Sequence, residues 1–311
     1  MTALPRDRIL AGIALMMGFN VLAPLLDVSA KLAAETIPVG QITAARFVVQ
    51  GALMLPVVLI MRLSWHASSR MVALVVLRAA LLIAATYSYV AAIAVMPIAD
   101  ALAIVFVEPF LVLILGWLLF KDEIGLRRIA ASVVGFGGVM LVIQPSLAVY
   151  GLVTLYPLAT ALSFTLYMLV TRAMSGGMHP VVMQLHTSLA GMAICLPLIW
   201  LADDSGWTVL DPVMPQGRAW LWLFGVGFWA GVSHMCMTYA LKFAPASTLA
   251  PLHYLEIVTA VALGYLIFGD FPNAPTWAGI GIIVASGLYV VHRERLIARA
   301  QTAAAALTTG V

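Results

Sequence analysis

The sequence predicts an all-α integral membrane protein with ten transmembrane helices, arranged as two inverted five-helix repeats. Three observations predict this fold class. First, the 311 residues are 63% hydrophobic and only 9% charged, whereas a soluble chain is about 25% charged. Second, the apolar residues form runs of about 20, the length that a helix needs to cross a bilayer. Third, the second half of the chain repeats the pattern of the first half.

The apolar runs follow one another through short connections, and each run is long enough for one crossing. The first run follows Arg6 and Arg8 but lacks a clear small-residue cleavage site, so it is interpreted as a span rather than a signal peptide. Only residues 202–218 form a long connection. We expect spans at about residues 9–30, 40–61, 71–95, 99–120, 127–144, 151–171, 180–201, 219–241, 247–268 and 275–292.

The basic residues are distributed unevenly between the connections. With the N-terminus in the cytoplasm, the cytoplasmic segments hold twelve Lys and Arg residues, and the outer segments hold only Lys31 and Arg218. Because cytoplasmic loops carry the excess of basic residues, both termini and the tail 293–311 are predicted to be cytoplasmic, in a bacterial-type inner membrane. The net charge of +3 follows from this topology and gives no sign of a nucleic-acid partner.

Two units of five spans, residues 1–145 and 151–292, account for the internal repetition. Glu108 matches Glu256 and Gly116 matches Gly264 at the same offset. Because five is an odd number, the second unit must cross the membrane in the opposite sense. Inverted repeats of this kind are typical of secondary transporters, which bind their substrate near the midplane between the two units.

Glu108 and Glu256 each interrupt an apolar run, where a carboxylate is costly and usually functional. After Glu108, Pro109 lacks the N–H that would pair with the Val105 carbonyl in a helix. His253 lies one turn before Glu256 on the same face. We predict that both glutamates face a central cavity and exchange protons during transport. The alternative is that each is a neutral structural residue that pairs with a neighbouring helix.

Asp27 and Arg46 are predicted to lie at similar depth near the outer surface, where an ion pair between them would act as a gate; the alternative is a static pair. Tyrosine and tryptophan rings suit an aromatic or heterocyclic solute because they combine flat apolar area with a polar group. Helix packing explains such residues about as often as a transport pathway does. The predicted substrate-binding residues are Asn20, Gln50, Tyr89, Glu108, Tyr167, Trp229, His253, Tyr254 and Glu256.

The sequence lacks several motifs that are typical of enzymes. It contains no Walker A loop, no His-Glu-x-x-His and no Gly-x-Ser-x-Gly. The six histidines are scattered, and Cys195 and Cys236 lie in separate apolar runs. We therefore expect no metal, no cofactor and no enzymatic activity. A channel or facilitator for small solutes is the main rival to a carrier, and a membrane-embedded enzyme is less favoured.

Several motifs carry a family resemblance: Met96-Pro97-Ile-Ala-Asp100, Val107-Glu108-Pro109-Phe110 and Leu115-Gly116-Trp-Leu-Leu-Phe-Lys-Asp-Glu123. With these motifs the chain resembles the drug/metabolite transporter superfamily, in its EamA group of ten-span carriers. The second copy departs from the pattern, since Ile257 replaces the proline and the copy ends at Asp270.

The resemblance implies a secondary carrier with a cavity lined by spans 1–4 and 6–9, with spans 5 and 10 at the periphery. It also implies that the substrate is a small organic metabolite and that the carrier works by alternating access in the lipid bilayer. Similar carriers export amino acids or take up S-adenosylmethionine or riboflavin. An amino acid-like, aromatic or nucleoside- or cofactor-like solute is therefore expected, and the chain is expected to work as a monomer or homodimer.

Overall fold

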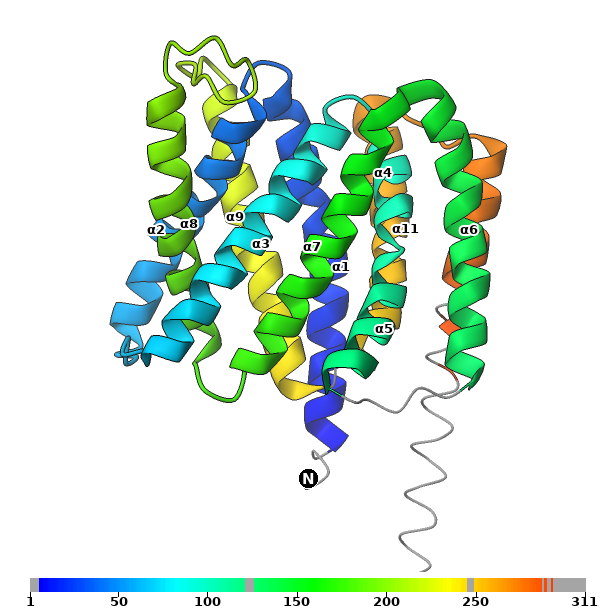
Figure 1. Cartoon of the computed structure of the whole chain (residues 1–311), viewed down its shortest axis with the longest axis horizontal. Helices are drawn as coiled ribbons and strands as arrows, with labels where there is room; N and C mark the ends of the chain where they lie inside the picture. The colour runs from blue at the N-terminus through cyan, green and yellow to red at the C-terminus, as the bar shows by residue number, and fades with distance from the viewer. Residues whose placement is uncertain (1–5, 121–125, 245–248, 287, 290–291, 293–311) are drawn as a thin grey trace, which may run out of the picture.

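The computed structural model describes residues 6–120, 126–244, 249–286, 288–289 and 292, and the regular structure of these residues is helical throughout (Figure 1). The residues that follow the fourth predicted span, with Asp122 and Glu123, lie outside the described residues, as do Pro245 and the predicted tail 293–311. The first half contains α1 (Arg6–Ala34), α2 (Val39–Ile60), α3 (Ser69–Ile93), α4 (Ile98–Val105), α5 (Glu108–Phe120) and α6 (Leu126–Tyr150).

The predicted fourth span is broken between α4 and α5. The N–H of Phe106 still donates to the Leu102 carbonyl at 3.1 Å, but the N–H of Val107 donates to Ile104, three residues back, at 3.2 Å. The helix tightens here because Pro109 offers no N–H for continued helical pairing. As a result, Glu108 is the first residue of α5.

The second half contains η1 (Gly151–Thr154), α7 (Leu155–Met174), α8 (Pro180–Ala202), α9 (Ala219–Phe243), η2 (Ala250–Leu255), α11 (Glu256–Leu263), the π-helical turn η3 (Gly264–Phe268) and the helix Ala274–Ser286. The ninth predicted span is also irregular, because the 3₁₀ helix η2 precedes α11. Glu256 is the first residue of α11, just as Glu108 is the first residue of α5.

Within the described residues, seven helical stretches are long and apolar enough to cross a membrane. One of them, Ile129–Met174, includes both α6 and α7, which are separated at Gly151. Gly151 has a φ of 59°, a left-handed conformation that glycine adopts without steric cost. Two shorter apolar helices, Glu256–Phe268 and Ala274–Ser286, follow. Lengths and compositions of this kind are those of a multi-pass membrane protein.

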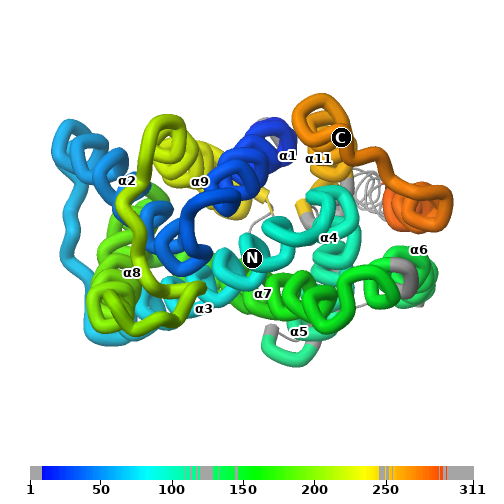
Figure 2. Tube along the Cα trace, turned by 90° about the horizontal axis from the view of Figure 1, so that it is seen from above, coloured from blue at the N-terminus to red at the C-terminus, as the bar shows by residue number. Residues whose placement is uncertain are grey.

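The helices pack across the two halves of the chain. α1 packs against α9, α3 against α7, and α2 against α8. α4 packs against α11, so the two interrupted segments lie side by side, as Figure 2 shows from above. α6 and the helix Ala274–Ser286 lie at the end of the molecule away from α2 and α8 (Figure 2).

Two glycines allow α6 and the helix Ala274–Ser286 to cross closely. A Cβ atom on Gly138 would lie 2.9 Å from the carbonyl oxygen of Gly279, and a Cβ atom on Gly279 would lie 2.6 Å from the carbonyl oxygen of Gly138. Only glycine permits this reciprocal backbone approach. The two helices are thus held to one another at the edge of the molecule, outside the helices that surround the candidate site.

Candidate functional site

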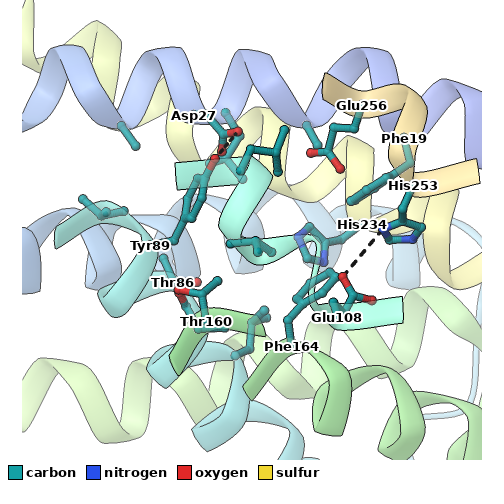
Figure 3. Close-up of a pocket in the computed structure, with 18 of the residues that line it drawn as sticks. Phe19, Asp27, Thr86, Tyr89, Glu108, Thr160, Phe164, His234, His253 and Glu256 are labelled. Atoms are coloured by element: carbon teal, nitrogen blue, oxygen red, sulfur yellow. Dashed lines mark hydrogen bonds and ion pairs between the residues drawn. The ribbon is translucent and has the colours of Figure 1, made fainter. Parts of the chain in front are cut away.

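A pocket lies among α1, α2, α3, α4, α5, α7, α9, η2 and α11, and it holds about 720 Å³ of empty space including its opening (Figure 3). Apolar side chains form much of its wall, including Phe19, Leu26, Leu102, Phe106 and Phe164. A mostly apolar wall with a few placed polar groups is typical of a site for an organic ligand. The polar lining residues are Asp27, Arg46, Thr86, Tyr89, Glu108, Thr160, His234, His253 and Glu256.

Both predicted glutamates face this pocket, and both are buried, with 3% of Glu108 and 7% of Glu256 exposed. The two helix breaks place them, since each is the first residue after an interruption. A carboxylate in the first turn of a helix interacts favourably with the helix dipole. Nδ1 of His253 lies 3.9 Å from Oε2 of Glu108 (Figure 3). The site therefore brings two carboxyl groups and an imidazole together away from bulk solvent.

Asp27 and Arg46 both line the pocket, but the described residues contain no ion pair between them within 4 Å. Asp27 instead accepts a hydrogen bond from the Tyr89 hydroxyl at 3.2 Å. Arg46 donates to Thr86 Oγ1, and its Nη2 lies 2.7 Å from Nε2 of His234. The predicted ion pair is therefore not formed, because α3 and α9 offer the guanidinium closer partners than α1 does.

A chain of buried polar groups continues from Arg46 away from the pocket. Nδ1 of His234 lies 3.2 Å from the Tyr167 hydroxyl, and that hydroxyl accepts a hydrogen bond from Arg78 Nη2 at 2.6 Å. The Arg78 guanidinium also lies over the Tyr167 ring, 4.5 Å from its centroid. Arg78 is fully buried, and its further acceptors are Thr171 at 2.8 Å, Gln184 at 3.3 Å and Thr187.

Four predicted binding residues, Asn20, Gln50, Tyr167 and Trp229, do not line the pocket. Asn20 Nδ2 donates to the Leu252 carbonyl at 2.7 Å, which holds α1 against η2 just before Glu256. Gln50 Nε2 lies 3.4 Å from Gln184 Oε1, and Tyr167 belongs to the polar chain of Arg78. Trp229 packs edge-on against Phe228, with 5.0 Å between centroids. The side chain of Tyr254 lies outside the described residues.

Sequence reasoning missed the roles of Arg78 and His234. Arg78 lies near the start of the third predicted span, where a long basic side chain would be expected to reach the cytoplasmic surface, but it is completely buried. The sequence does contain possible partners for a buried arginine. Tyr167 and Thr171 lie one turn apart on the sixth predicted span, and Thr187 lies on the seventh. His234 was visible as a histidine within an apolar run, but no periodicity showed that it joins the pocket to the buried arginine.

Lys31, near the end of α1, contacts two segments that are distant in the sequence. Its Nζ lies 2.9 Å from Oδ2 of Asp270 and donates to the Met96 carbonyl at 3.2 Å. It also lies 4.8 Å from the centroid of the Phe268 ring. Lys31 therefore connects α1 to the end of the ninth predicted span and to the turn before α4.

Within the described part of the chain, no group of three or more His, Cys, Asp or Glu side chains is arranged to hold a metal ion. Cys195 and Cys236 are free cysteines. The pocket instead offers carboxyl groups, hydroxyl groups, one guanidinium and aromatic rings. This set is suited to binding a polar organic solute and to exchanging protons.

Comparisons with known proteins match the chain to one family pattern and to several proteins named as transporters. The pattern of the EamA-like transporter family matches residues 10–144 and again residues 151–291. The riboflavin transporter of Vibrio cholerae serotype O1 is 27% identical over 199 residues, which span 64% of this chain and 64% of that protein. The S-adenosylmethionine uptake transporter of Rickettsia prowazekii is 24% identical over 223 residues, covering 71% and 72% of the two chains.

A further relative matches over nearly its whole length. The pseudopaline exporter CntI of Pseudomonas aeruginosa is 24% identical over 292 residues, or 93% of this chain and 98% of that protein. A solved crystal structure superposes with a TM-score of 0.70 at 19% identity, covering 94% of this chain and 98% of that one. At this identity the likeness concerns the fold. The family pattern is independent of this likeness and covers both halves of the chain.

Proposed function

The chain belongs to the EamA-like transporter family, and from this premise we propose that it is a secondary carrier that moves a small organic metabolite by alternating access. The observation that carries the proposal is the placement of Glu108 and Glu256. Both follow a helix interruption, and both face one pocket enclosed by helices from the two halves of the chain. Interrupted helices around a central site are the recurring construction of secondary transporters.

The ten-span inverted repeat, with units 1–145 and 151–292, is part of this proposal. The packing supports it because contacts occur in matched sets. α1 packs against α9 as α7 packs against α3, and α2 packs against α9 as α8 packs against α3. α1 also contacts α11, while α7 contacts both α4 and α5. An exchange of the two units leaves this set of contacts unchanged, as expected for a two-fold axis in the membrane plane.

We propose that both termini face the cytoplasm of a cell with an inner membrane. The distribution of basic residues supports this orientation, since only Lys31 and Arg218 fall in the expected outer segments. In this orientation the Lys31–Asp270 ion pair lies at the outer end of the pocket. The tight contact of Gly12 with α9, where a Cβ atom would lie 2.9 Å from Ala244 Cβ, lies at the cytoplasmic end.

The proposed substrate is a small organic solute with an aromatic or heterocyclic part. Phe19, Phe164 and Tyr89 line the pocket and provide flat surfaces for such a ring. Riboflavin and S-adenosylmethionine, named for two of the relatives, both contain a heterocycle. Because the chain spans only 64% of the length of the Vibrio riboflavin transporter that it matches, the substrate of that protein is not transferred to this one.

Transport is proposed to be sensitive to protons through Glu108. Burial in an apolar wall makes the charge of a carboxylate costly, so the protonation of Glu108 depends on whether the pocket is wet or dry. His253 is the nearest titratable group, and Glu256, Asp27, Arg46 and His234 line the same pocket. A group in such a setting can couple solute binding to proton binding.

Counterflow in proteoliposomes separates this carrier from a channel. Vesicles that hold the purified protein are loaded with the small-molecule fraction of a bacterial cell extract, and uptake of an isotope-labelled copy of that fraction is followed. A carrier exchanges inner for outer solute, so loaded vesicles accumulate label faster than empty vesicles. A channel gives equal initial rates in loaded and empty vesicles, and that result would contradict the proposal.

A further inference from the structure

Arg46 stands in the pocket wall with neutral hydrogen-bond partners, and from this we infer that the transported solute carries an anionic oxygen group, a carboxylate or a phosphoryl group, that binds Arg46. The inference rests on the proposed function and adds to it the charge class of the substrate. It does not follow from the predicted role of Arg46, which was to pair with Asp27 in a gate.

The surroundings of Arg46 fix the position of its guanidinium. Only 4% of the residue is exposed. Thr86 on α3 accepts from Nη1, and His234 on α9 lies 2.7 Å from Nη2. A guanidinium has five N–H donors and no acceptor. His234 must therefore accept through Nε2, which leaves its proton on Nδ1 and keeps the imidazole neutral beside the positive charge.

The same guanidinium has donor capacity that the protein does not use. Its Nε is buried and has no hydrogen-bond partner among the described residues. A buried donor without a partner costs free energy, and a donor of a charged group costs more. In a pocket wall, this cost is removed when a ligand brings an acceptor. Planar, paired donors of this kind match the oxygens of a carboxylate or a phosphate.

The positive charge of Arg46 is not balanced by contact with an acid. Two of the three carboxyl groups of the pocket have other neighbours: Asp27 accepts from Tyr89, and Glu108 lies beside His253. Within the described residues, none of the three forms an ion pair with Arg46 at 4 Å or less. Asp27 acts on Arg46 only at longer range. A buried charge needs a partner at contact distance to offset the loss of hydration.

A second buried arginine adds to the positive potential at this wall. Arg78 joins Arg46 through Tyr167 and His234, and its hydrogen bonds within the described residues go to hydroxyl or amide oxygens. Two guanidinium groups thus lie on one side of the pocket, and their hydrogen-bond partners are neutral. An anionic group on the solute would offset both, since charges interact strongly where water is scarce.

The test uses the small-molecule fraction of a bacterial cell extract as the probe. Proteoliposomes with the full chain, or with Arg46→Gln, Arg46→Lys or Arg218→Gln, are incubated with this fraction, and accumulated solutes are identified by mass spectrometry. Arg218 is exposed in the connection before α9, so Arg218→Gln removes an equal charge far from the pocket. Size-exclusion chromatography before reconstitution sets equal amounts of folded protein, and Arg46→Lys keeps the charge if Arg46→Gln folds poorly.

The expected result is that wild type and Arg218→Gln accumulate solutes with a carboxylate or phosphoryl group, and the mass spectra distinguish these two sources. Arg46→Gln should lower this accumulation by about tenfold or more, the loss expected for a charged hydrogen bond. Arg46→Lys should retain the preference for anionic solutes at a lower rate. Accumulation of neutral or cationic solutes alone, or equal accumulation of anionic solutes by Arg46→Gln, would overturn the inference. Failure of wild type to accumulate any solute would instead overturn the proposed carrier function itself.

Discussion

Glu108→Gln is expected to abolish the accumulation that a pH gradient drives, while the protein remains folded. One pH unit is worth about 1.4 kcal/mol per proton, so a carrier that exchanges one proton per solute can build up to about a tenfold solute gradient. Glutamine has the shape of a neutral carboxyl group but cannot exchange a proton. The variant should therefore give an accumulation ratio near one, measured in proteoliposomes with an imposed gradient of one unit.

The pH profile of initial rates gives the sign of this effect. At low pH the wild-type carboxyl is protonated and resembles glutamine, so the two proteins should differ least there. As the pH rises from 5 to 8 their rates should diverge, since only wild type changes charge. Glu35→Gln is the matched control, because Glu35 is exposed at the end of α1 and should leave the profile unchanged. Profiles of identical shape for wild type and Glu108→Gln would remove Glu108 as the coupling group.

Gly191→Leu is expected to cost about 3 kcal/mol of stability or more and to lower the recovery of folded protein. A Cβ atom on Gly191 in α8 would lie 2.6 Å from Cγ of Phe47 in α2, and Phe47 is fully buried. The ring cannot move aside without displacing α2, which carries Arg46. Gly227 in α9 also lies close to α2, because a Cβ atom there would lie 3.1 Å from the Arg46 carbonyl oxygen. Thermal unfolding in detergent, followed by size-exclusion chromatography, measures the loss.

Gly137→Leu is the matched control for this substitution. Nothing lies within 4 Å of a Cβ atom at Gly137, which is also in the interior of a helix. Leucine favours helix more than glycine by up to about 1 kcal/mol, so the control should be as stable as wild type or slightly more stable. If Gly191→Leu and Gly137→Leu unfold at the same temperature, the close contact between α2 and α8 is not what positions Arg46.

Much of the fold was predictable because membrane crossing imposes strict limits on sequence. A helix satisfies its backbone groups internally in lipid, so the long apolar runs indicate where the helices lie. The break before Glu108 also followed from the sequence, since Pro109 removes a donor. The prediction held less well in the ninth span, where the 3₁₀ helix η2 and the π-helical turn η3 were not expected.

The candidate site was predictable in part. Glu108, Glu256, His253 and Tyr89 were expected in a cavity because polar groups in apolar spans are costly, and they line the pocket. The hydrogen-bond partners of these side chains were not predictable, because they depend on how each helix is rotated and on contacts between residues far apart in the sequence. Arg46 is bonded to residues of α3 and α9 rather than to Asp27 of α1 for this reason. The same argument about cost also identified Gln50, but its Nε2 donates to Gln184 Oε1 at 3.4 Å, away from the pocket, and its Oε1 has no hydrogen-bond partner among the described residues.

Labelling of a single cysteine in the pocket tests alternating access most directly. Ala23 lines the pocket and is 5% exposed, so Ala23→Cys is made in a background without Cys195 and Cys236. Ser205→Cys in the 202–218 connection and His66→Cys between α2 and α3 report which side a membrane-impermeant maleimide reaches. Both control residues are exposed.

The account predicts that Ser205→Cys reacts only from outside and His66→Cys only from the cytoplasmic side. Ala23→Cys should react from both sides, and the counterflow solutes should slow both reactions. A pocket cysteine that reacts from one side alone, or from neither, while both controls react as expected, would contradict transport through this pocket by alternating access.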